Sequence, residues 1–586
     1  MKNKEIIKLI LFIFISLSIV SCKDSNEDIG AGVSGESWLN KDTIEIVQNS
    51  PVKIIFNAAS SWSASSSSSW CKIDKSSGER GQNIIYLSTS TTSQVDRSST
   101  ITINVKGYSS SSFIVKQKAT DPFISTENSE VNSEVKKYLS EMYLWNDEYK
   151  TLTLDITKDY ISFFDDALLS MKTNTLDKRL ESDGNYYLFS YIEKLNPVSK
   201  SRATKLVDKE LEYSFGITGI TPVMIGTEQN FSIYFCIEGV HPDSPASEAG
   251  LKRGSMIDKI NGAEITQSTY ISQFINLLYP SSPSTLTVND AADGDKKSTI
   301  TSKAMYLNPI ILSKVEEKEG KKIGYLVYSN FDAGFDEELF NVFKDFKKQG
   351  VTDLILDLRY NGGGHTISAN LISTCIAGDY AKGKVFVSYR YNDERMKQLK
   401  KERDEDPFIM EKYANLGIYL TDGFLELKKI YCIIGTQTAS SSELVINGLR
   451  GIDIDVVLIG EKSVGKNVGM EYKDVDVRNN TYRIVPITFQ SYNAKGFGDY
   501  QDGFKPEKSL IIDETNPNNE QGIFYNFRDY GTTSEPLYAK AIELITGKKL
   551  STTSRTHDSN MMFGKRLNVT KKYRPGFDGM LKKAKE

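Results

Sequence analysis

The stretch LDLRYNGGG, residues 356–364, decides the fold class of this chain. It begins as an apolar run typical of a buried strand and ends in three consecutive glycines. A glycine-rich loop leaves its backbone amides open to approach, because no side chain shields them. The loop lacks the lysine and hydroxyl residue of a phosphate-binding loop, which argues against a nucleotide site.

Strand and helix patterns alternate around this stretch. Apolar runs predict buried strands at residues 323–328, 354–358, 430–434 and 456–459. Between the first two runs, a helical period carries Leu339, Phe343 and Phe346 on one face, and Gly350 is the expected end of that helix. This alternation predicts an α/β core over residues 306–550.

A second motif, GTQTASSSELVING, occupies residues 435–448 and joins a predicted strand to a predicted helix. A serine at this place lies at the positive end of the helix dipole, which favours developing negative charge. Helix capping alone would also explain a hydroxyl-rich turn followed by Glu443. Ser440, Ser441 and Ser442 are therefore the candidate nucleophiles.

A third motif, GEKSVGKNVG, occupies residues 460–469 and places Lys466 26 residues after Ser440. The pKa of a lysine shielded from water can fall from about 10.4 toward neutrality. A neutral lysine can accept the proton of a serine nucleophile, so the two residues are candidates for a dyad. His365, next to the glycines, offers a Ser–His alternative, although a lone histidine beside a loop more often serves packing.

Upstream, the pattern DSPASEAGLKRGSMIDKING at residues 243–262 is similar to a PDZ domain, which we place at 212–305. A strand is expected at 231–235 and a helix at 269–278. PDZ domains add an extended peptide as a strand and capture its terminal carboxylate with backbone amides. The resemblance assigns this capture to Phe215, Gly216 and Ile217. The alternative is a regulatory domain that never contacts substrate.

The first residues predict a secretion signal. Lysines 2, 4 and 8 precede an apolar run from Leu9 to Val20, too short to span a membrane comfortably. The following Ser21-Cys22 resembles a bacterial lipobox, which implies a signal peptide over 1–21, lipidation of Cys22 and a polar tether over 22–35. The expected location is the cell envelope of a Gram-negative bacterium, anchored in the outer membrane. The alternative is a plain signal peptide with an incidental cysteine.

Two regions separate this leader from the PDZ pattern. Short alternating runs between Ser/Gly-rich turns predict an all-β module over 36–118. With Trp62 and Trp70 flanking a serine tract, it resembles BACON domains, immunoglobulin-like β-sandwiches, and this resemblance implies glycan contact by the module. The alternative is a spacer whose tryptophans fill its core. Residues 125–210 show a helical period and are expected to form a helical cap with no chemistry of its own.

Composition excludes several classes of function. Hydrophobic residues make up 39% and charged residues 25%, which is ordinary for globular protein. A net charge of −4 over 586 residues argues against nucleic acid as a partner. The three histidines and five cysteines form no metal-binding motif, so we expect neither metal nor cofactor. The last residues, 551–586, are basic and polar, and predict no function.

The order of DLRxNxGG, TASxSE and GxxxxGK, downstream of a PDZ pattern, is similar to the C-terminal processing (tail-specific) serine peptidases over about residues 130–545. The resemblance implies a crotonase-like or ClpP-like core, with Ser440 as nucleophile, Lys466 as base, and Gly363 and Ser441 amides binding the oxyanion. It also implies protein or peptide substrates held by their C-terminal ends.

The chain departs from the family pattern at Met470, where many members carry a glutamine that orients the lysine. This departure keeps a second reading open, namely a non-catalytic surface lipoprotein that binds peptides or glycans through a degenerate peptidase domain. A third reading, acyl transfer on lipids or cell-wall esters, fits the PDZ pattern poorly because that pattern recognises peptide ends.

Overall fold

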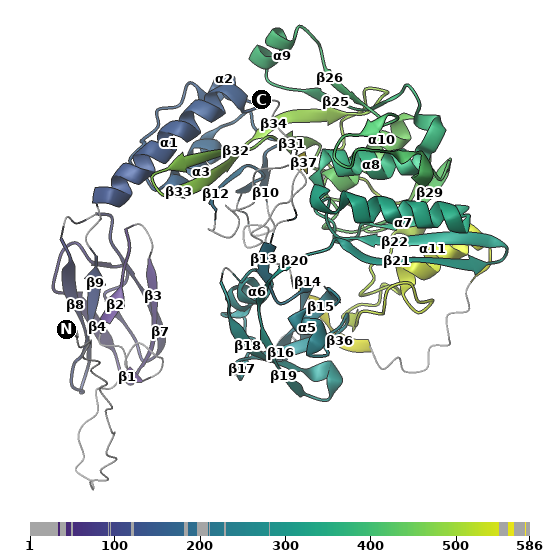
Figure 1. Cartoon of the computed structure of the whole chain (residues 1–586). Coiled ribbons are helices and arrows are strands. Elements are labelled where there is room, and N and C mark those ends of the chain that lie inside the picture. The colour runs from purple at the N-terminus through teal and green to yellow at the C-terminus, as the bar shows by residue number, and fades with distance from the viewer. Residues whose placement is uncertain are drawn as a thin grey trace, which may run out of the picture. The chain divides into compact units, whose positions relative to one another are not determined.

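The computed structural model describes residues 33–34, 43–48, 51–118 without 92 and 94, 122–180, 184, 186–195, 209, 211–280 without 228 and 229, 282–549, 561–567 and 580–581. The chain divides into two compact units, residues 1–125 and 126–586 (Figure 1). The predicted signal peptide, Cys22 and most of the tether lie outside the described residues.

The first unit consists of two sheets around one core. One sheet has the order β1(Val33–Ser34), β3(Val52–Ala58), β7(Gly81–Ser88), β5(Lys72–Ile73). The other has the order β2(Thr43–Glu45), β9(Ser111–Gln117), β8(Arg97–Val105), β4(Trp62–Ser66), β6(Ser77–Gly78). Alternate residues of each long strand point inward, as a period of two requires. Trp62 is buried in this core, where its ring contacts Phe56 edge-on.

Helices begin the second unit, as the period predicts, with α1(Pro122–Met142), α2(Asn146–Tyr149) and α3(Tyr160–Ser170). The helical expectation for the rest of 125–210 is wrong, because β10(Lys178–Leu180), β11(Tyr186–Leu188) and β12(Tyr191–Lys194) follow. β12 pairs with β33(Asn480–Val485), almost 300 residues away, which in turn pairs with β32(Lys473–Val477). A partner so distant leaves no local sequence signal.

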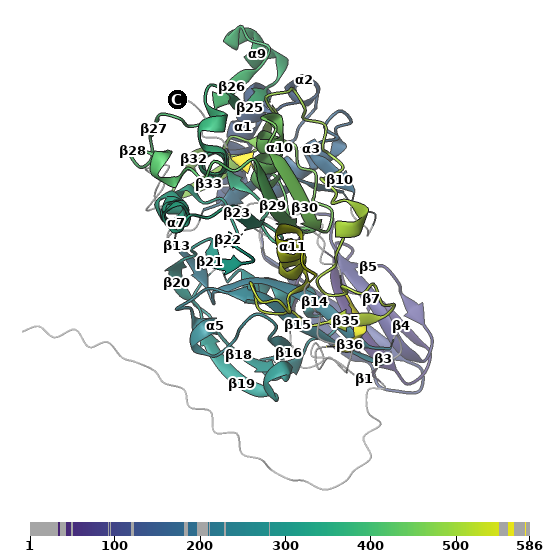
Figure 2. The same cartoon turned by 90° about the vertical axis from the view of Figure 1, so that its right-hand side faces the viewer.

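The PDZ region comprises β13(Leu211–Ser214), β14(Ile217–Gly226), β15(Phe231–Val240), α5(Pro245–Glu248), β16(Met256–Ile260), β17(Ala263–Glu264), α6(Tyr270–Leu278), β18(Thr285–Asp290), β19(Lys296–Thr301) and β20(Lys303–Tyr306). The main sheet runs β19-β18-β16-β15-β14 and continues into β36(Met561–Arg566) and β35(Ile523–Tyr525). Figure 2 shows β14, β15, β35 and β36 side by side. Phe235 and Phe274 centre a core that joins this sheet to α6.

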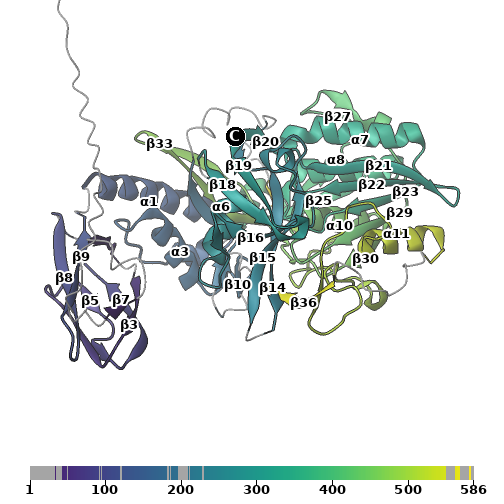
Figure 3. The ribbon, with the colours of Figure 1, turned by 90° about the horizontal axis from the view of Figure 1, so that it is seen from below.

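The central sheet of the α/β core has the order β21(Ile310–Lys318), β22(Lys321–Tyr328), β23(Asp353–Asp357), β29(Lys429–Ile434), β30(Asp455–Gly460). The last four strands are parallel. One face packs against α7(Asp336–Gln349), α8(Thr366–Ala377) and α10(Ser441–Gly451), and the other against α11(Pro536–Thr546). Figure 3 shows α11 on the side of the sheet away from α7 and α8. All four predicted strands and the Gly350 helix end are confirmed.

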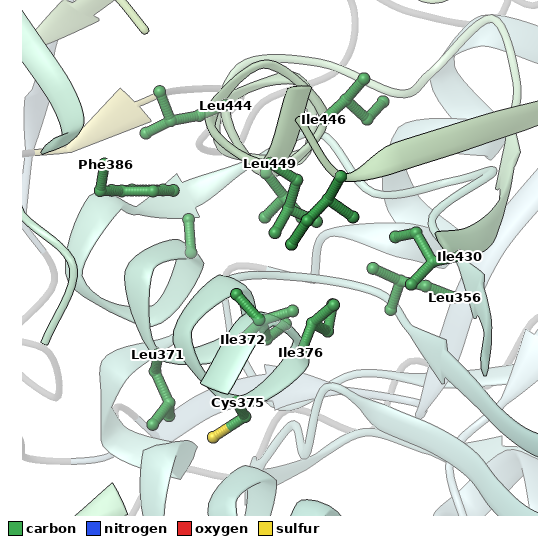
Figure 4. Close-up of a cluster of buried hydrophobic side chains, with 14 of the residues drawn as sticks. Leu356, Leu371, Ile372, Cys375, Ile376, Phe386, Ile430, Leu444, Ile446 and Leu449 are labelled. Carbon is green, nitrogen blue, oxygen red and sulfur yellow. The ribbon is translucent and has the colours of Figure 1, made fainter. Parts of the chain in front are cut away.

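Apolar residues of α8 and α10 interdigitate over this sheet (Figure 4). Ile372 and Ile376 of α8 are fully buried against the core that also holds Ile446 and Leu449 of α10. Such close packing fixes both helix starts relative to the sheet.

The core also contains a second sheet of six strands. Its order is β24(Gly364–His365), β37(Met580–Leu581), β31(Val468–Met470), β34(Ile487–Tyr492), β25(Val385–Arg390), β26(Asp404–Pro407). The remaining described elements of the core are α9(Asp393–Leu399), β27(Lys412–Tyr413) and β28(Ile418–Tyr419). β36 and β37 belong to the basic tail, to which the sequence assigned no role.

Candidate active site

Ser440 lies between the end of β29 and the start of α10, with φ 60° and ψ −113°. A positive φ is rare for a residue with a side chain, and such strain tends to occur at functional positions. The side chain is fully buried, and Oγ has no hydrogen-bond partner among the described residues. Ser440 therefore holds an unengaged hydroxyl in a strained turn at a helix N-terminus.

The two neighbouring serines are engaged with the glycine loop. Ser441 Oγ donates a hydrogen bond to the Gly364 carbonyl at 2.7 Å. Ser442 Oγ donates one to the Asn361 carbonyl at 2.9 Å. Their hydroxyls therefore tie the start of α10 to the loop after β23, whereas the hydroxyl of Ser440 makes no such bond.

Glu443 joins the serine turn to the lysine loop. Its Oε2 accepts hydrogen bonds from the backbone amides of Ser440 at 2.9 Å and Lys466 at 2.8 Å. Its Oε1 accepts from Ser463 Oγ at 2.5 Å and from the Gly465 amide at 2.6 Å. Burial raises the pKa of Glu443, and these four bonds oppose that rise. The capping role expected for this glutamate thus extends to a loop twenty residues away.

Lys466 is fully buried in the loop between β30 and β31. Its Nζ lies 3.8 Å from Met470 Sδ and 4.5 Å from the centroid of the Phe189 ring. Because Ser440 Oγ has no hydrogen-bond partner, the serine and lysine side chains share no hydrogen bond in this structure. The residue that replaces the family's glutamine, Met470, is itself in contact with the lysine head group.

Asp177 is a buried carboxylate close enough to Lys466 for their charges to interact. Its oxygens accept hydrogen bonds from the amides of Phe189 and Ser190 and from the hydroxyls of Ser190 and Tyr143, all between 2.7 and 2.9 Å. Burial raises the pKa of Asp177, and these bonds and the charge of Lys466 oppose the rise.

The region that contributes Asp177 and Phe189 was expected to be a helical cap with no chemistry of its own, and the structure places these two residues beside Lys466. It surrounds the lysine of the candidate dyad with a ring and a carboxylate. No motif in the sequence marks these residues, because only the tertiary contact between β31 and this region gives them a role.

The glycine loop turns sharply between β23 and α8. Gly363 has φ 116° and its amide donates to Asn361 Oδ1 at 2.9 Å, so this predicted oxyanion donor is engaged in this structure. At Gly364, φ is 134° and a Cβ would lie 2.2 Å from the Phe331 carbonyl oxygen. Ser441, the other predicted donor, is the first residue of α10, whose amide has no acceptor within the helix.

His365 lies at the far end of this loop. The Ala333 amide donates to its Nδ1 at 3.3 Å, and Nδ1 is 3.1 Å from the Phe331 carbonyl oxygen. Because Ser440 Oγ has no hydrogen-bond partner in the described part of the chain, Ser440 and His365 share no hydrogen bond in this structure.

The residues predicted to capture a peptide carboxylate lie where β14 begins. Phe215 is fully buried in the PDZ core, and Ile217 is the first residue of β14. Gly216 has φ 85°. Its amide donates a hydrogen bond to Ser214 Oγ at 2.9 Å, so this predicted carboxylate donor is already engaged in this structure. A Cβ at Gly216 would lie 2.0 Å from Ser244 Cβ, so the tight turn requires glycine.

A buried ionic cluster connects the PDZ region to the glycine loop. Glu514 Oε2 accepts from Arg253 of the PDZ region at 2.5 Å and from Arg359 of the loop after β23 at 2.6 Å. Arg359 also binds Asp357 and Glu535. Burial by itself would raise the pKa of Glu514, but the charges of Arg253 and Arg359 lower it to about 2.

Within the described part of the chain, no three His, Cys, Asp or Glu side chains lie together as metal ligands would. None of its helices is long and apolar enough to cross a membrane.

Comparison with protein families now identifies the architecture. Residues 322–508 match the model of peptidase family S41, residues 236–288 a PDZ domain model, and residues 60–118 the BACON model, described as an N-terminal binding domain. The chain therefore contains an S41 peptidase domain together with PDZ and BACON domains. The S41 match spans the glycine loop, the serine turn and the lysine loop, so the three sequence motifs fall within one family domain.

Curated relatives include carboxyl-terminal processing proteases. That of Picosynechococcus is 27% identical over 230 residues, 39% of this chain and 49% of its own. That of Bartonella bacilliformis is 30% identical over 229 residues, 38% of this chain and 47% of its own. The chain thus spans about half the length of the curated relatives it matches.

Among solved structures, a protein from Bacteroides fragilis described as an S41 protease has the same fold. The likeness has a TM-score of 0.54 at 23% identity and covers 71% of this chain and 97% of that one. At this identity the likeness concerns the fold. It supports the S41 architecture for the mixed α/β region, whereas the immunoglobulin-like and crotonase-like details of the predicted fold class stay predictions.

Proposed function

We propose that this chain is a serine endopeptidase that cleaves polypeptides with a Ser440–Lys466 dyad and binds their C-terminal ends through its PDZ domain. The observation that carries the proposal is the contrast among the three serines: Ser440 Oγ has no hydrogen-bond partner among the described residues, whereas Ser441 and Ser442 donate hydrogen bonds to the glycine loop. A nucleophile must be free to lose its proton, so this contrast favours Ser440.

In the proposed reaction, neutral Lys466 accepts the Ser440 Oγ proton while Oγ attacks the substrate carbonyl. Burial away from water favours a neutral amine, whereas the Phe189 ring and the nearby Asp177 carboxylate favour an ammonium. The serine and lysine side chains must turn toward each other when substrate binds, as catalytic groups of unliganded enzymes often do. Lys466 then protonates the leaving amine, and water hydrolyses the acyl-enzyme.

The oxyanion is proposed to bind the amides of Ser441 and Gly363. Loss of one such donor typically costs about 3–4 kcal/mol of transition-state stabilisation. The Gly363 amide must leave Asn361 Oδ1 to take part, so a change in the glycine loop accompanies catalysis in this proposal. The remaining parts of the proposal are lipidation at Cys22, a cell-envelope location in a Gram-negative bacterium, and glycan contact by the N-terminal unit.

The test uses the chain without residues 1–22, incubated with casein and followed by mass spectrometry. We expect cleavage by the parent and none by Ser440→Ala or Lys466→Ala. Thr436→Ala and Lys462→Ala are matched controls, because both side chains are exposed in the same two loops and are expected to retain cleavage. Cleavage by both dyad variants, with their fold intact by circular dichroism, would overturn the proposal.

A further inference from the structure

The free edge of β14 is the surface on which a PDZ domain adds an extended peptide. One edge of β14 pairs with β15, and α6 packs beside the strand. The other edge is occupied at its far end by β36, a strand of the chain's own basic tail. Val223, Met224 and Ile225 of β14 pair with Arg566, Lys565 and Gly564.

The direction of β36 is that of a PDZ ligand. β36 runs antiparallel to β14, so its C-terminal end points toward the start of β14, where Phe215 and Gly216 form the predicted carboxylate loop. Beyond β36, the Leu567 amide donates to the Pro222 carbonyl at 2.8 Å, and the Leu567 side chain packs against the PDZ core. A substrate strand longer than about five residues along β14 would meet this segment.

Specific side chains hold β36 in place. A Cβ on Gly564 would lie 2.3 Å from the Met224 carbonyl oxygen, so only glycine permits this close pairing. Arg566 forms ion pairs of 2.8 Å with both Glu461 and Asp513 of the peptidase core. β35 covers the other edge of β36, so the strand bridges the PDZ domain and the core.

The tail also reaches the candidate active site. β37 lies between β24 and β31, with Met580 paired to Gly364 and Leu581 paired to both His365 and Met470. Gly364 belongs to the predicted oxyanion loop, and Met470 contacts the Lys466 head group. β37 is thus an extended segment paired with both the glycine loop and β31, close to the fully buried Ser440 turn.

We propose that the chain's own C-terminal strands, β36 and β37, are an intramolecular ligand that occupies the substrate path from the PDZ edge to the active site. The chain is then held in a self-bound state, and a substrate must displace the tail. Displacement of the tail by a substrate rests on the proposed function. Occupancy of the β14 edge does not, because it can be measured without turnover.

The test measures peptide binding by full-length chain carrying Ser440→Ala, with the leader removed. The probe is a fluorescent, end-blocked peptide of residues 559–568, and binding is followed by anisotropy. A tethered ligand competes at an effective concentration near the millimolar range, so the self-bound chain should bind the probe on the order of 100-fold more weakly than an opened chain. Adding Gly564→Val expels β36 and should produce that gain.

Two further arms keep the result interpretable. Arg566→Glu places a like charge beside Glu461 and Asp513, and should also open the edge if Gly564→Val fails to fold. A probe carrying Gly564→Val itself should not bind the opened chain, because it meets the same overlap with Met224. Equal binding of the probe by closed and opened chains, or no binding by either opened chain, would mean that β36 is a fixed structural strand and would overturn the inference.

Failure of the proposed function is separately visible. With Ser440 intact, Gly564→Val should lower KM for an unstructured substrate without lowering kcat. Probe binding that responds to Gly564→Val, without cleavage by any chain, would sink the peptidase proposal and leave the self-bound state standing.

Discussion

A single carboxylate oxygen holds the two candidate catalytic residues together. Glu443 Oε2 accepts both the Ser440 and Lys466 amides, so the nucleophile turn and the base loop cannot move apart without breaking a buried hydrogen bond. Loss of a buried acceptor is costly, because each donor that bonded to it is left without a partner in a place that water does not reach. At the residue scale, the relative position of Ser440 and Lys466 therefore depends on the side chain of Glu443.

The substitution Glu443→Gln tests this dependence. Glutamine has one acceptor oxygen, so at least two of the four donors lose their partner, at about 1–3 kcal/mol each. We expect kcat/KM to fall by more than the decrease in the folded fraction of the variant can explain. Glu507→Gln, at an exposed position, is the control. Unchanged kcat/KM would show that Glu443 does not position the dyad.

Asp177→Asn tests the charge beside the base. The carboxylate favours the ammonium form of Lys466, so its removal should make the amine neutral at lower pH. The rising limb of the pH–kcat/KM profile should therefore move to lower pH, with a stability loss of about 1–2 kcal/mol from altered hydrogen bonds. A rising limb that stays in place would mean that Asp177 carries no charge next to Lys466.

At the scale of elements, the site is made where strands end and helices begin. β23 leads to the glycine loop, β29 to the serine turn and β30 to the lysine loop, and parallel pairing brings these three ends to one edge of the sheet. The packing of α8 against α10 then fixes the loop and the turn relative to each other. The close approach of Phe331 to Gly364 sets the exact course of the loop.

Gly364→Ala should disturb that course. Its φ of 134° and the overlap with the Phe331 carbonyl oxygen predict a loss of at least about 1–3 kcal/mol in the free energy of unfolding, together with lost activity. Gly383→Ala is the matched control, because Gly383 also has a positive φ but meets nothing within 4 Å, so we expect about 1–2 kcal/mol from strain alone. Urea unfolding of both variants measures the difference. Equal losses would contradict the close contact with Phe331.

At the scale of the second unit, Glu514 connects the PDZ domain to the catalytic loop. It binds Arg253 from the PDZ domain and Arg359 from the glycine loop after β23, and both arginines are buried. Removing one member of a buried ionic cluster is strongly destabilising, because it leaves a buried charge without its partner. The cluster therefore constrains how the PDZ domain packs against the core.

The low pKa of Glu514 predicts a pH dependence of stability. Its folded-state value of about 2 lies below the ordinary 4.5, so its contribution is fully present above pH 4.5 and is lost as the pH falls toward 2. By linkage this contribution is on the order of 3 kcal/mol. Glu514→Gln should lower Tm at neutral pH and flatten the fall of Tm between pH 5 and 3. A parallel fall in both proteins would contradict the assignment.

Much of this architecture follows from the sequence by itself. Periods of two and of 3.6 predicted the strands and helices of the α/β core, and Gly350 its helix end, because each depends on neighbours within a few residues. The order of the three motifs and the PDZ pattern predicted a resemblance to the C-terminal processing peptidases, and the matches to the S41 and PDZ models confirm it. Ser440 and Lys466 were singled out in the same way, and their catalytic roles stay predictions.

The tertiary structure decided what surrounds those residues. Adjacent serines look alike in sequence, and only the glycine loop, some eighty residues earlier, distinguishes the engaged hydroxyls from the unpartnered one. The strand nature of β12, the place of Asp177 beside Lys466, and the docking of the basic tail on β14 likewise depend on partners far along the chain. Local periodicity reports which face of an element is apolar, whereas the partners of buried polar groups and strand edges are chosen only when the chain folds.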